Sequence, residues 1–268
     1  MKLAKLIASR AIFLSAATNQ AVQLFKTKGT LTLPKGYKLV QILGEGLSSY
    51  LGYVAQSKKN ILVVFRGTED LFDILKDFNF WQTPYPFVEN AGKTHKGFTQ
   101  IYSTSVRQQL YKALQHISSS KKLFIAGHSL GGAMATLAAL DLAVNTPFKK
   151  PIVYTFGSPR VGDPTFTQVF NQKVKDSIRI TNVFDIVPLF PASFMTIKYK
   201  QVHRKLPITF QYFNLVKNHE IIHYYQQLAT LNPAYAKHLC QRNPGFCPII
   251  TAKKENTLKT LTLFPKKG

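Results

Sequence analysis

Short and nearly continuous apolar runs recur along the chain, and each ends at a glycine, a proline or a polar loop. They lie at residues 61–68, 121–127, 151–163 and 177–191. Such runs are typical of strands that are buried on both faces, and helical patterns separate them along the chain. The pattern therefore predicts the α/β class, with a mostly parallel central sheet that helices cover on both faces.

The segments between these runs carry apolar residues at helical spacing. One predicted helix has an apolar face that runs through Ile101, Val106, Leu110, Leu114 and Ile117, and "GGAMATLAALDLAVN" (131–145) predicts another. The first residues show the same spacing, at positions 3, 6, 7, 11, 14 and 17. This favours an amphipathic helix of the folded domain over a cleaved signal segment.

No run of about 18 apolar residues appears, so we predict no transmembrane helix. The default expectation is a cytoplasmic protein or one at a membrane surface, and secretion stays open. The length of 268 residues and the 45% hydrophobic content fit one domain over residues 1–250. Residues 251–268 form a basic tail that we expect to be poorly ordered.

The net charge of +23 comes from 35 Lys and Arg against 12 Asp and Glu. Residues 61–120 are almost neutral, with six basic and five acidic side chains. Such an excess attracts anionic surfaces, either lipid head groups or nucleic acid, although a general effect on solubility also fits. No recognition helix, zinc finger or RNA-stacking motif accompanies the charge, so nucleic acid is not an expected partner.

The two cysteines, Cys240 and Cys247, flank the turn signal Asn-Pro-Gly at 243–245. A disulfide and two free thiols both fit this spacing. Neither the cysteines nor His219 and His223, four residues apart, complete a set of zinc ligands. We expect no metal and no cofactor.

The stretch "GHSLG" (127–131) fits the G-x-S-x-G nucleophile elbow, which links a strand to a helix through a tight turn. The turn projects the serine out of the sheet, and small residues on either side let the strand and helix approach closely. An alanine-rich helix follows, as close packing requires. The pattern thus predicts that Ser129 is a nucleophile. The alternative is an ordinary turn in which Ser129 only caps the helix.

A serine nucleophile needs a base, and the base needs a carboxylate that orients it. Asp185 lies at the end of the strand "IRITNVFD", whereas Asp163 lies in a turn where aspartate is common and is the second candidate. Among the later histidines, His219 lies at a loop–helix junction from which a base can reach the serine. His223 is mid-helix, where a packing or surface role is more usual.

Six blocks in order resemble the class 3 lipases, the fungal-lipase-like branch of the α/β-hydrolase fold, over roughly residues 35–230: "VVFRGTE", "HKGF", "GHSLGGAMATLAALDL", "TFGSPRVGDPTF", "RITNVFDIVPLFP" and "HEIIHYYQQL". The resemblance implies Ser129 as nucleophile, Asp185 as acid and His219 as base. Members have a tyrosine five residues and a leucine nine residues after the base, and Tyr224 and Leu228 occupy those places.

The resemblance also implies an oxyanion hole formed by the backbone N–H groups of Leu130 and Thr68, with the Thr68 hydroxyl as a further donor. Arg66, Asp77 and His95 lie in similar blocks, and we interpret them as structural. His128 belongs to the elbow, but its position next to Ser129 turns its side chain away from the serine.

The segment Phe78–Gly92 falls where the family carries its lid. It holds Trp81, Phe80, Tyr85 and Phe87, which we expect to form an aromatic flap over the acyl pocket. The alternative is a packed loop over the core.

These features lead us to expect a serine ester hydrolase that cleaves acyl esters of glycerolipids, as a triacylglycerol lipase does, through an acyl-enzyme. A phospholipase A1 and a short-chain carboxylesterase are the alternatives among enzymes. The alternative outside enzymes is a module that uses the lipase fold to bind anionic membranes. The expected partner is a lipid ester substrate, with peripheral contact to an anionic lipid surface; the sequence predicts no oligomeric state.

Overall fold

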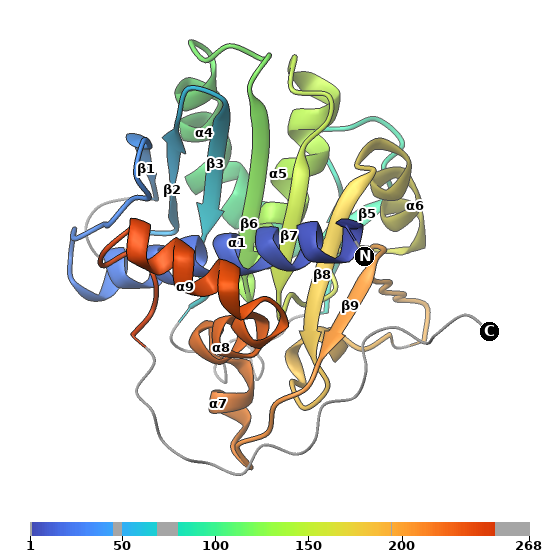
Figure 1. The fold of residues 1–268 in the computed structure, drawn as a ribbon. Helices are drawn as coiled ribbons and strands as arrows, with labels where there is room; N and C mark the ends of the chain where they lie inside the picture. The colour runs from blue at the N-terminus through green and yellow to red at the C-terminus, as the bar shows by residue number, and fades with distance from the viewer. Residues whose placement is uncertain (1, 45–49, 69–79, 194, 250–268) are drawn as a thin grey trace.

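A seven-stranded sheet organises the chain in the computed structural model, which describes residues 2–44, 50–68, 80–193 and 195–249. The strand order is β1-β2-β3-β6-β7-β8-β9. Strands β3 to β9 of this sheet run parallel, whereas β1 and β2 join antiparallel at one edge. The prediction of the α/β class with a mostly parallel sheet is therefore confirmed (Figure 1).

The strands of this sheet have the following bounds: β1 Lys38–Leu43, β2 Gly52–Gln56, β3 Asn60–Phe65, β6 Lys122–His128, β7 Ile152–Phe156, β8 Asp176–Asn182 and β9 Lys205–Ile208. A separate two-stranded hairpin consists of β4 Gln82–Pro84 and β5 Lys93–His95.

The described α-helices are α1 Lys2–Lys26, α3 Lys96–Ile101, α4 Arg107–Leu114, α5 Leu130–Asn145, α6 Pro164–Lys173, α7 Leu215–His219, α8 Ile221–Leu231 and α9 Pro233–Arg242. A π-helical stretch covers Tyr102–Val106, and a 3-10 turn covers Val187–Leu189.

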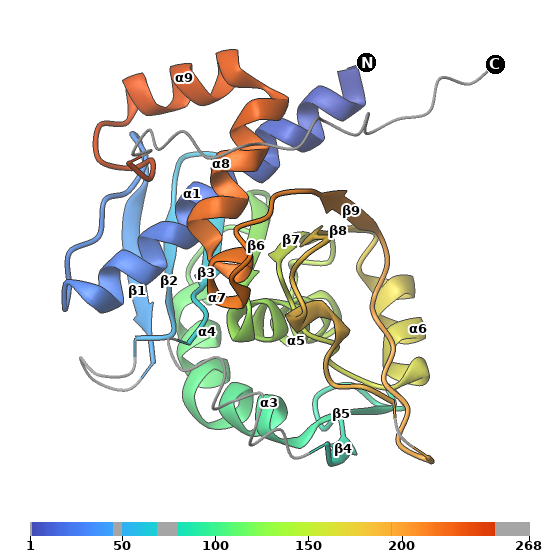
Figure 2. The same ribbon diagram turned by 90° about the horizontal axis from the view of Figure 1, so that it is seen from below.

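Helices cover the sheet on both faces, and each face has its own hydrophobic core. Helices α1, α8 and α9 lie on one face, and α3 to α6 lie on the other (Figures 1 and 2). Alternate residues of a strand point to opposite faces, so Val63 joins the core beneath α5 while Val64 joins the core beneath α1. This double burial explains why the strands are nearly continuous apolar runs.

The parallel strands end at the same edge of the sheet. Phe65 of β3 pairs with Gly127 of β6, and His128 pairs with Phe156 of β7. The carboxyl ends of the strands therefore lie together at the lower edge in Figure 1, where α7 also lies. Functional groups of α/β proteins gather at this edge.

Two predicted elements differ in detail from the structure. The helix expected through Ile101 and Ile117 is interrupted by the π-helical stretch and ends at Leu114. Strand β8 ends at Asn182, so Asp185 lies three residues beyond it in a turn instead of ending the strand.

The N-terminal amphipathic pattern does form a helix, α1. Its buried face includes Ala11, Leu14 and Ala17, whereas Leu3 and Leu6 are exposed because this end of the helix extends beyond the core. In the part of the chain that the structure describes, no helix has the length and apolar character needed to cross a membrane. Cys240 and Cys247 form a disulfide, with Cα atoms 5.5 Å apart. The basic tail lies outside the described residues.

Candidate active site

Ser129 lies at the junction between β6 and α5, with backbone angles φ 56° and ψ −127°. A non-glycine residue rarely adopts this conformation, which concentrates at functional sites. The side chain of Ser129 makes no capping hydrogen bond to α5. The geometry is therefore that of a nucleophile elbow and not that of a helix cap.

Glycines on both sides of Ser129 allow the close approach of strand and helix that the elbow requires. A Cβ atom on Gly127 would lie 2.0 Å from the carbonyl oxygen of Gly131, and one on Gly131 would lie 2.4 Å from the carbonyl oxygen of Arg66. Both contacts involve backbone atoms, which cannot move aside as a side chain can. No larger residue fits at either position without displacing the elbow.

Asp185 and His219 form a buried pair. The Nδ1 atom of His219 lies 2.7 Å from the Oδ2 atom of Asp185. The same Oδ2 atom accepts a hydrogen bond from the hydroxyl of Tyr224 at 2.6 Å, and Oδ1 accepts one from the N–H of Val187 at 2.9 Å. Three donors thus fix the carboxylate, and the carboxylate fixes the imidazole ring.

This arrangement leaves the other ring nitrogen of His219 available. The Nε2 atom is buried and has no hydrogen-bond partner among the described residues. Buried polar atoms usually have a partner, so an orphaned one indicates a site that a reacting group completes. Because Asp185 accepts from Nδ1–H, Nε2 is the atom that can take up a proton.

Two contacts bring Ser129 and the Asp185–His219 pair to the same place. The N–H of Ser129 donates to the carbonyl oxygen of Phe156, the residue before Gly157. A Cβ atom on Gly157 would lie 2.7 Å from Oδ2 of Asp185 and 2.9 Å from Cε1 of His219. The three sequence-predicted residues therefore surround the carboxyl end of β7.

His128 contributes a contact that the sequence did not reveal. Its side chain turns toward His219: the two rings lie 4.5 Å apart, and Nε2–H of His128 donates to the carbonyl oxygen of His219 at 2.6 Å. Burial, and then the proximity of His219, hold the pKa of His128 well below its usual value, so this ring stays neutral. From the sequence we predicted only that the side chain of His128 turns away from Ser129, and we assigned it no partner.

The positions proposed for the oxyanion hole lie beside the serine. Leu130 is the first residue of α5, so its N–H has no acceptor within the helix. The hydroxyl oxygen of Thr68 is buried without a hydrogen-bond partner in the described chain. A Cβ atom on its neighbour Gly67 would lie 2.8 Å from Cβ of Ser129. Both donors thus lie next to the elbow, at the positive end of the α5 dipole.

The second candidates for acid and base have other partners. Asp163 caps α6, where its Oδ1 atom accepts from the N–H of Phe166 at 2.7 Å. His223 pairs with Glu220 at 3.1 Å and with Gln226 at 2.9 Å. His219 and His223 therefore have different partners. Within the described ranges, no group of three or more His, Cys, Asp or Glu side chains could hold a metal ion.

The segment in which we expect an aromatic flap has two parts that differ in burial. Tyr85 is buried, donates its hydroxyl to the carbonyl oxygen of Leu137 at 2.9 Å, and packs edge-on against Phe87. Tyr85 belongs to the core and also contacts the ring of Phe166 on α6, whereas Phe87 is partly buried and packs against that core beside Tyr102. Phe80 and Trp81 are exposed, with 42% and 61% of their surface accessible. Phe78 lies outside the described residues.

Arg66 and His95 have structural contacts. Arg66 donates to the carbonyl oxygen of Gly67 and lies 3.6 Å above the ring of Phe25. His95 caps α3 by accepting from the N–H of Phe98. Asp77 lies outside the described residues.

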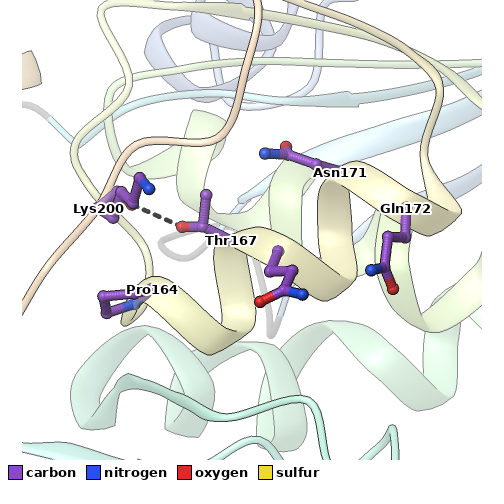
Figure 3. Close-up of a pocket in the computed structure, with 6 residues that line it drawn as sticks. Pro164, Thr167, Asn171, Gln172 and Lys200 are labelled. Carbon is purple, nitrogen blue, oxygen red and sulfur yellow. Dashed lines mark hydrogen bonds between the residues drawn. The ribbon is translucent and has the colours of Figure 1, made fainter.

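A pocket between α6 and Lys200 lies apart from these groups. Pro164, Thr167 and Asn171 are among the residues that line it, and the hydroxyl of Thr167 donates to the carbonyl oxygen of Lys200 (Figure 3). None of the candidate catalytic residues lines this pocket.

The α/β-hydrolase fold presents its nucleophile on an elbow of this kind, with acid and base following along the chain, and the chain has that fold. The family model for class 3 lipases matches residues 62–195, half of the chain. The chain belongs to the class 3 lipase family.

Comparison with individual proteins agrees with this family. The chain is 39% identical to a lipase of Rhizomucor miehei over 147 residues, which cover 52% of this chain and 39% of that protein. It is 28% identical to phospholipase A1-IIgamma of Arabidopsis thaliana over 218 residues, 66% of this chain and 51% of that protein. The structure of the native Rhizomucor miehei lipase propeptide complex superposes with a TM-score of 0.66 at 27% identity, over 76% of this chain and 68% of that chain.

The chain spans about half the length of the relatives that it matches in sequence, for example 42% of a Rhizopus niveus lipase. Another similar structure, at 25% identity, a TM-score of 0.60 and coverage of 74% of this chain and 78% of that one, is described as a triacylglycerol lipase whose catalytic centre is a serine protease triad.

Proposed function

We propose that the protein is a serine ester hydrolase that cleaves acyl esters of glycerolipids through a Ser129–His219–Asp185 triad. One observation carries the proposal: a strained serine elbow lies at the same sheet edge as a buried Asp–His pair whose Nε2 atom has no partner in the described chain. A turn with a purely structural function has no need of the strain at Ser129.

The geometry supports a two-step reaction. The Oγ atom of Ser129 attacks the ester carbonyl carbon while Nε2 of His219 takes the hydroxyl proton. Asp185 stabilises the imidazolium that forms. When the tetrahedral intermediate collapses, the C–O bond to the alcohol breaks and His219 donates its proton to the leaving oxygen. Water then attacks the acyl-enzyme by the same route, which releases the fatty acid and restores Ser129.

The negative charge of each tetrahedral intermediate needs donors that are in place before the reaction. In the proposal these are the N–H groups of Leu130 and Thr68, with the Thr68 hydroxyl as a third donor. The orphaned Thr68 hydroxyl supports this function. Removal of one such donor typically costs about 3–4 kcal/mol of transition-state stabilisation. No step of this scheme uses a metal or a cofactor.

Lipid esters are the substrate class that the relatives favour. Their names include lipase, secreted mono- and diacylglycerol lipase and phospholipase A1. The charge of +23 fits an anionic lipid surface, which favours phospholipase A1 activity as the second candidate. We propose that the enzyme works at such a surface by peripheral contact, in which the exposed Phe80 and Trp81 take part.

The test compares the parent protein with Ser129→Ala on a matched substrate series. The series consists of a short-chain ester, a long-chain ester, a triacylglycerol emulsion, and neutral and anionic phospholipid vesicles. Serine-dependent release of fatty acid, reduced by about 10⁶-fold in the variant, would support the triad. The preferred substrate would separate lipase, phospholipase and short-chain esterase. Equal rates for the two proteins on every substrate would refute the proposal.

A Trp81→Ala variant tests the exposed part of the flap. We expect a larger loss of activity on long-chain or aggregated substrate than on the short soluble ester, because only the former needs an apolar surface beside the site. Equal losses on both substrates would count against a flap.

A further inference from the structure

Large exposed apolar side chains lie mainly in the connections that follow the carboxyl ends of strands. Of the twelve such side chains among the described residues, eight belong to connections that follow carboxyl ends of strands: Phe80, Trp81, Val183, Leu189, Met195, Phe213, Leu215 and Val216. Neighbouring exposed apolar side chains mark an interaction surface, whereas single ones need no explanation.

The segment Phe213–Lys217 is the most prominent part of this surface. Five consecutive residues are exposed, and Phe213 has 88% of its surface accessible. Phe213 has a positive φ of 51°, which is uncommon for a bulky residue. Leu215 and Val216 follow on α7 with 47% and 44% exposed. In Figure 1 this segment projects beyond the lower edge of the sheet, and Figure 2 shows the molecule from that side.

The base of the segment is held firmly. The N–H of Tyr212 donates to the side-chain oxygen of Asn218 at 2.9 Å, and the side-chain amide of Asn182 donates to the carbonyl oxygen of Asn218 at 3.0 Å. Next along the chain is His219, whose carbonyl oxygen accepts from His128. The apolar end of α7 is therefore a rigid projection that lies one helical turn from the proposed base.

The charges beside the projection are mostly positive. Lys217 is exposed on α7, with its ammonium group 6.0 Å from the centre of the Tyr212 ring. Lys26, at the end of α1, is close enough to Glu220 to contribute to the lowered pKa of that carboxyl, after the larger effect of its hydrogen bond with His223. Glu220 itself has a partner within the same part of the chain, since its carboxylate lies 3.1 Å from Nε2 of His223.

We propose that the segment Phe213–Lys217 docks the protein on an anionic lipid bilayer, with Phe213, Leu215 and Val216 inserted between head groups and Lys217 beside lipid phosphates. Apolar side chains that leave water and cations that meet an anionic surface both favour this position. The inference deepens the proposed function and rests on it, because docking at α7 brings the bilayer to within one helical turn of His219.

The experiment measures vesicle binding separately from catalysis. All proteins carry Ser129→Ala, so no vesicle is hydrolysed, and co-sedimentation is measured with phosphatidylcholine vesicles with and without phosphatidylglycerol. The test variants are Phe213→Ser with Leu215→Ser, and Lys217→Gln. The matched controls are Leu39→Ser and Lys38→Gln, since Leu39 is 46% exposed and both residues lie at the opposite end of the sheet. Thermal melting verifies that each variant is folded.

We expect the double serine variant to lower the partition coefficient at least tenfold on anionic vesicles. Lys217→Gln should lower it about fivefold on anionic vesicles and leave binding to neutral vesicles unchanged. Both controls should bind as the parent does. The proposal would be overturned if the test variants bound like the parent, or if Leu39→Ser weakened binding as much as they do. Failure of the proposed function would appear separately, as a Ser129 protein that hydrolyses no ester.

Discussion

A methyl group at position 157 is expected to disable the site without unfolding the protein. Gly157 follows β7 with a positive φ of 55°, a conformation that favours glycine. Placing an L-residue there costs about 1–2 kcal/mol of backbone energy. That cost alone is a modest fraction of a typical folding stability of about 5–15 kcal/mol, so Gly157→Ala should still fold.

The larger effect of this substitution falls on Asp185 and His219. The added Cβ would lie 2.7 Å from Oδ2 of Asp185, 2.9 Å from Cε1 of His219 and 3.0 Å from its Nδ1, whereas ordinary contacts begin at 3.4 Å. The pair must therefore separate from Gly157 by roughly 0.7 Å, the difference between 3.4 and 2.7 Å. Since a misplacement of about 1 Å can cost about 100-fold in rate, we expect kcat/KM to fall by about 10- to 100-fold.

The assay is steady-state hydrolysis of a short soluble ester, with thermal unfolding measured in parallel. Gly36→Ala is the matched control. Gly36 also has a positive φ, of 87°, but a Cβ there would have no atom within 4 Å. The control therefore carries the backbone strain without the contact with Asp185 and His219. Its kcat/KM should equal that of the parent.

The reasoning is refuted if Gly157→Ala and Gly36→Ala retain the same kcat/KM. That result would mean that the Asp185–His219 pair tolerates displacement, or that it does not determine the rate. A large loss of activity with a collapse of thermal stability in Gly157→Ala alone would also contradict the expectation, since the predicted change is local.

Three further predictions concern buried polar groups. Tyr224→Phe removes the 2.6 Å hydrogen bond from the Tyr224 hydroxyl to Asp185. On the soluble ester kcat should fall about tenfold while KM stays constant. An unchanged kcat would show that this hydroxyl does not position Asp185. Asp141→Ala removes a buried carboxylate that accepts from the hydroxyl of Tyr102 and pairs with Arg107, each at 2.7 Å. Urea unfolding should show a loss of about 3–5 kcal/mol, and a loss under about 1 kcal/mol would contradict this. Burial holds the pKa of His128 below 6.5, so only the unfolded chain gains this proton as the pH falls below that value. The free energy of unfolding should therefore decrease by up to about 1.4 kcal/mol per pH unit below pH 6.5. His128→Gln should reduce this slope. Equal slopes for the two proteins would argue against a buried, neutral His128.

The elements that position the serine could be predicted from sequence because their signals are local. An apolar run followed by small residues and an alanine-rich helix has few other structural solutions, and β6, Ser129 and α5 form as the pattern indicates. Asp185 could be selected because it closely follows a strand, and His219 because it lies at a helix junction. The 2.7 Å contact between Asp185 and His219 joins residues 34 positions apart. It could not be predicted from a local pattern, because only the fold brings the two side chains together.

Other features depended on packing that no local pattern encodes. Tyr85 and Trp81 lie in the same aromatic segment, yet one is buried in the core and the other is exposed, because only the tertiary structure places Leu137 next to the Tyr85 hydroxyl. The contact between His128 and the carbonyl group of His219 joins residues 91 positions apart. The state of Cys240 and Cys247 was open for the same reason: spacing fits a bridge, but the bridge needs the Cα separation of 5.5 Å that the turn provides.

The packing of α1 against α8 has a consequence for biosynthesis. These helices share one core, although about 200 residues of chain separate them. At about 5–20 residues per second, the apolar face of α1 remains without its partner for roughly 10–40 s, a period in which chaperones can bind it. His219 lies two residues before α8, so the proposed base is also synthesised late. Nascent chains arrested before residue 221 should therefore be cleaved in α1 by added protease, and protection at that stage would disprove the order of assembly.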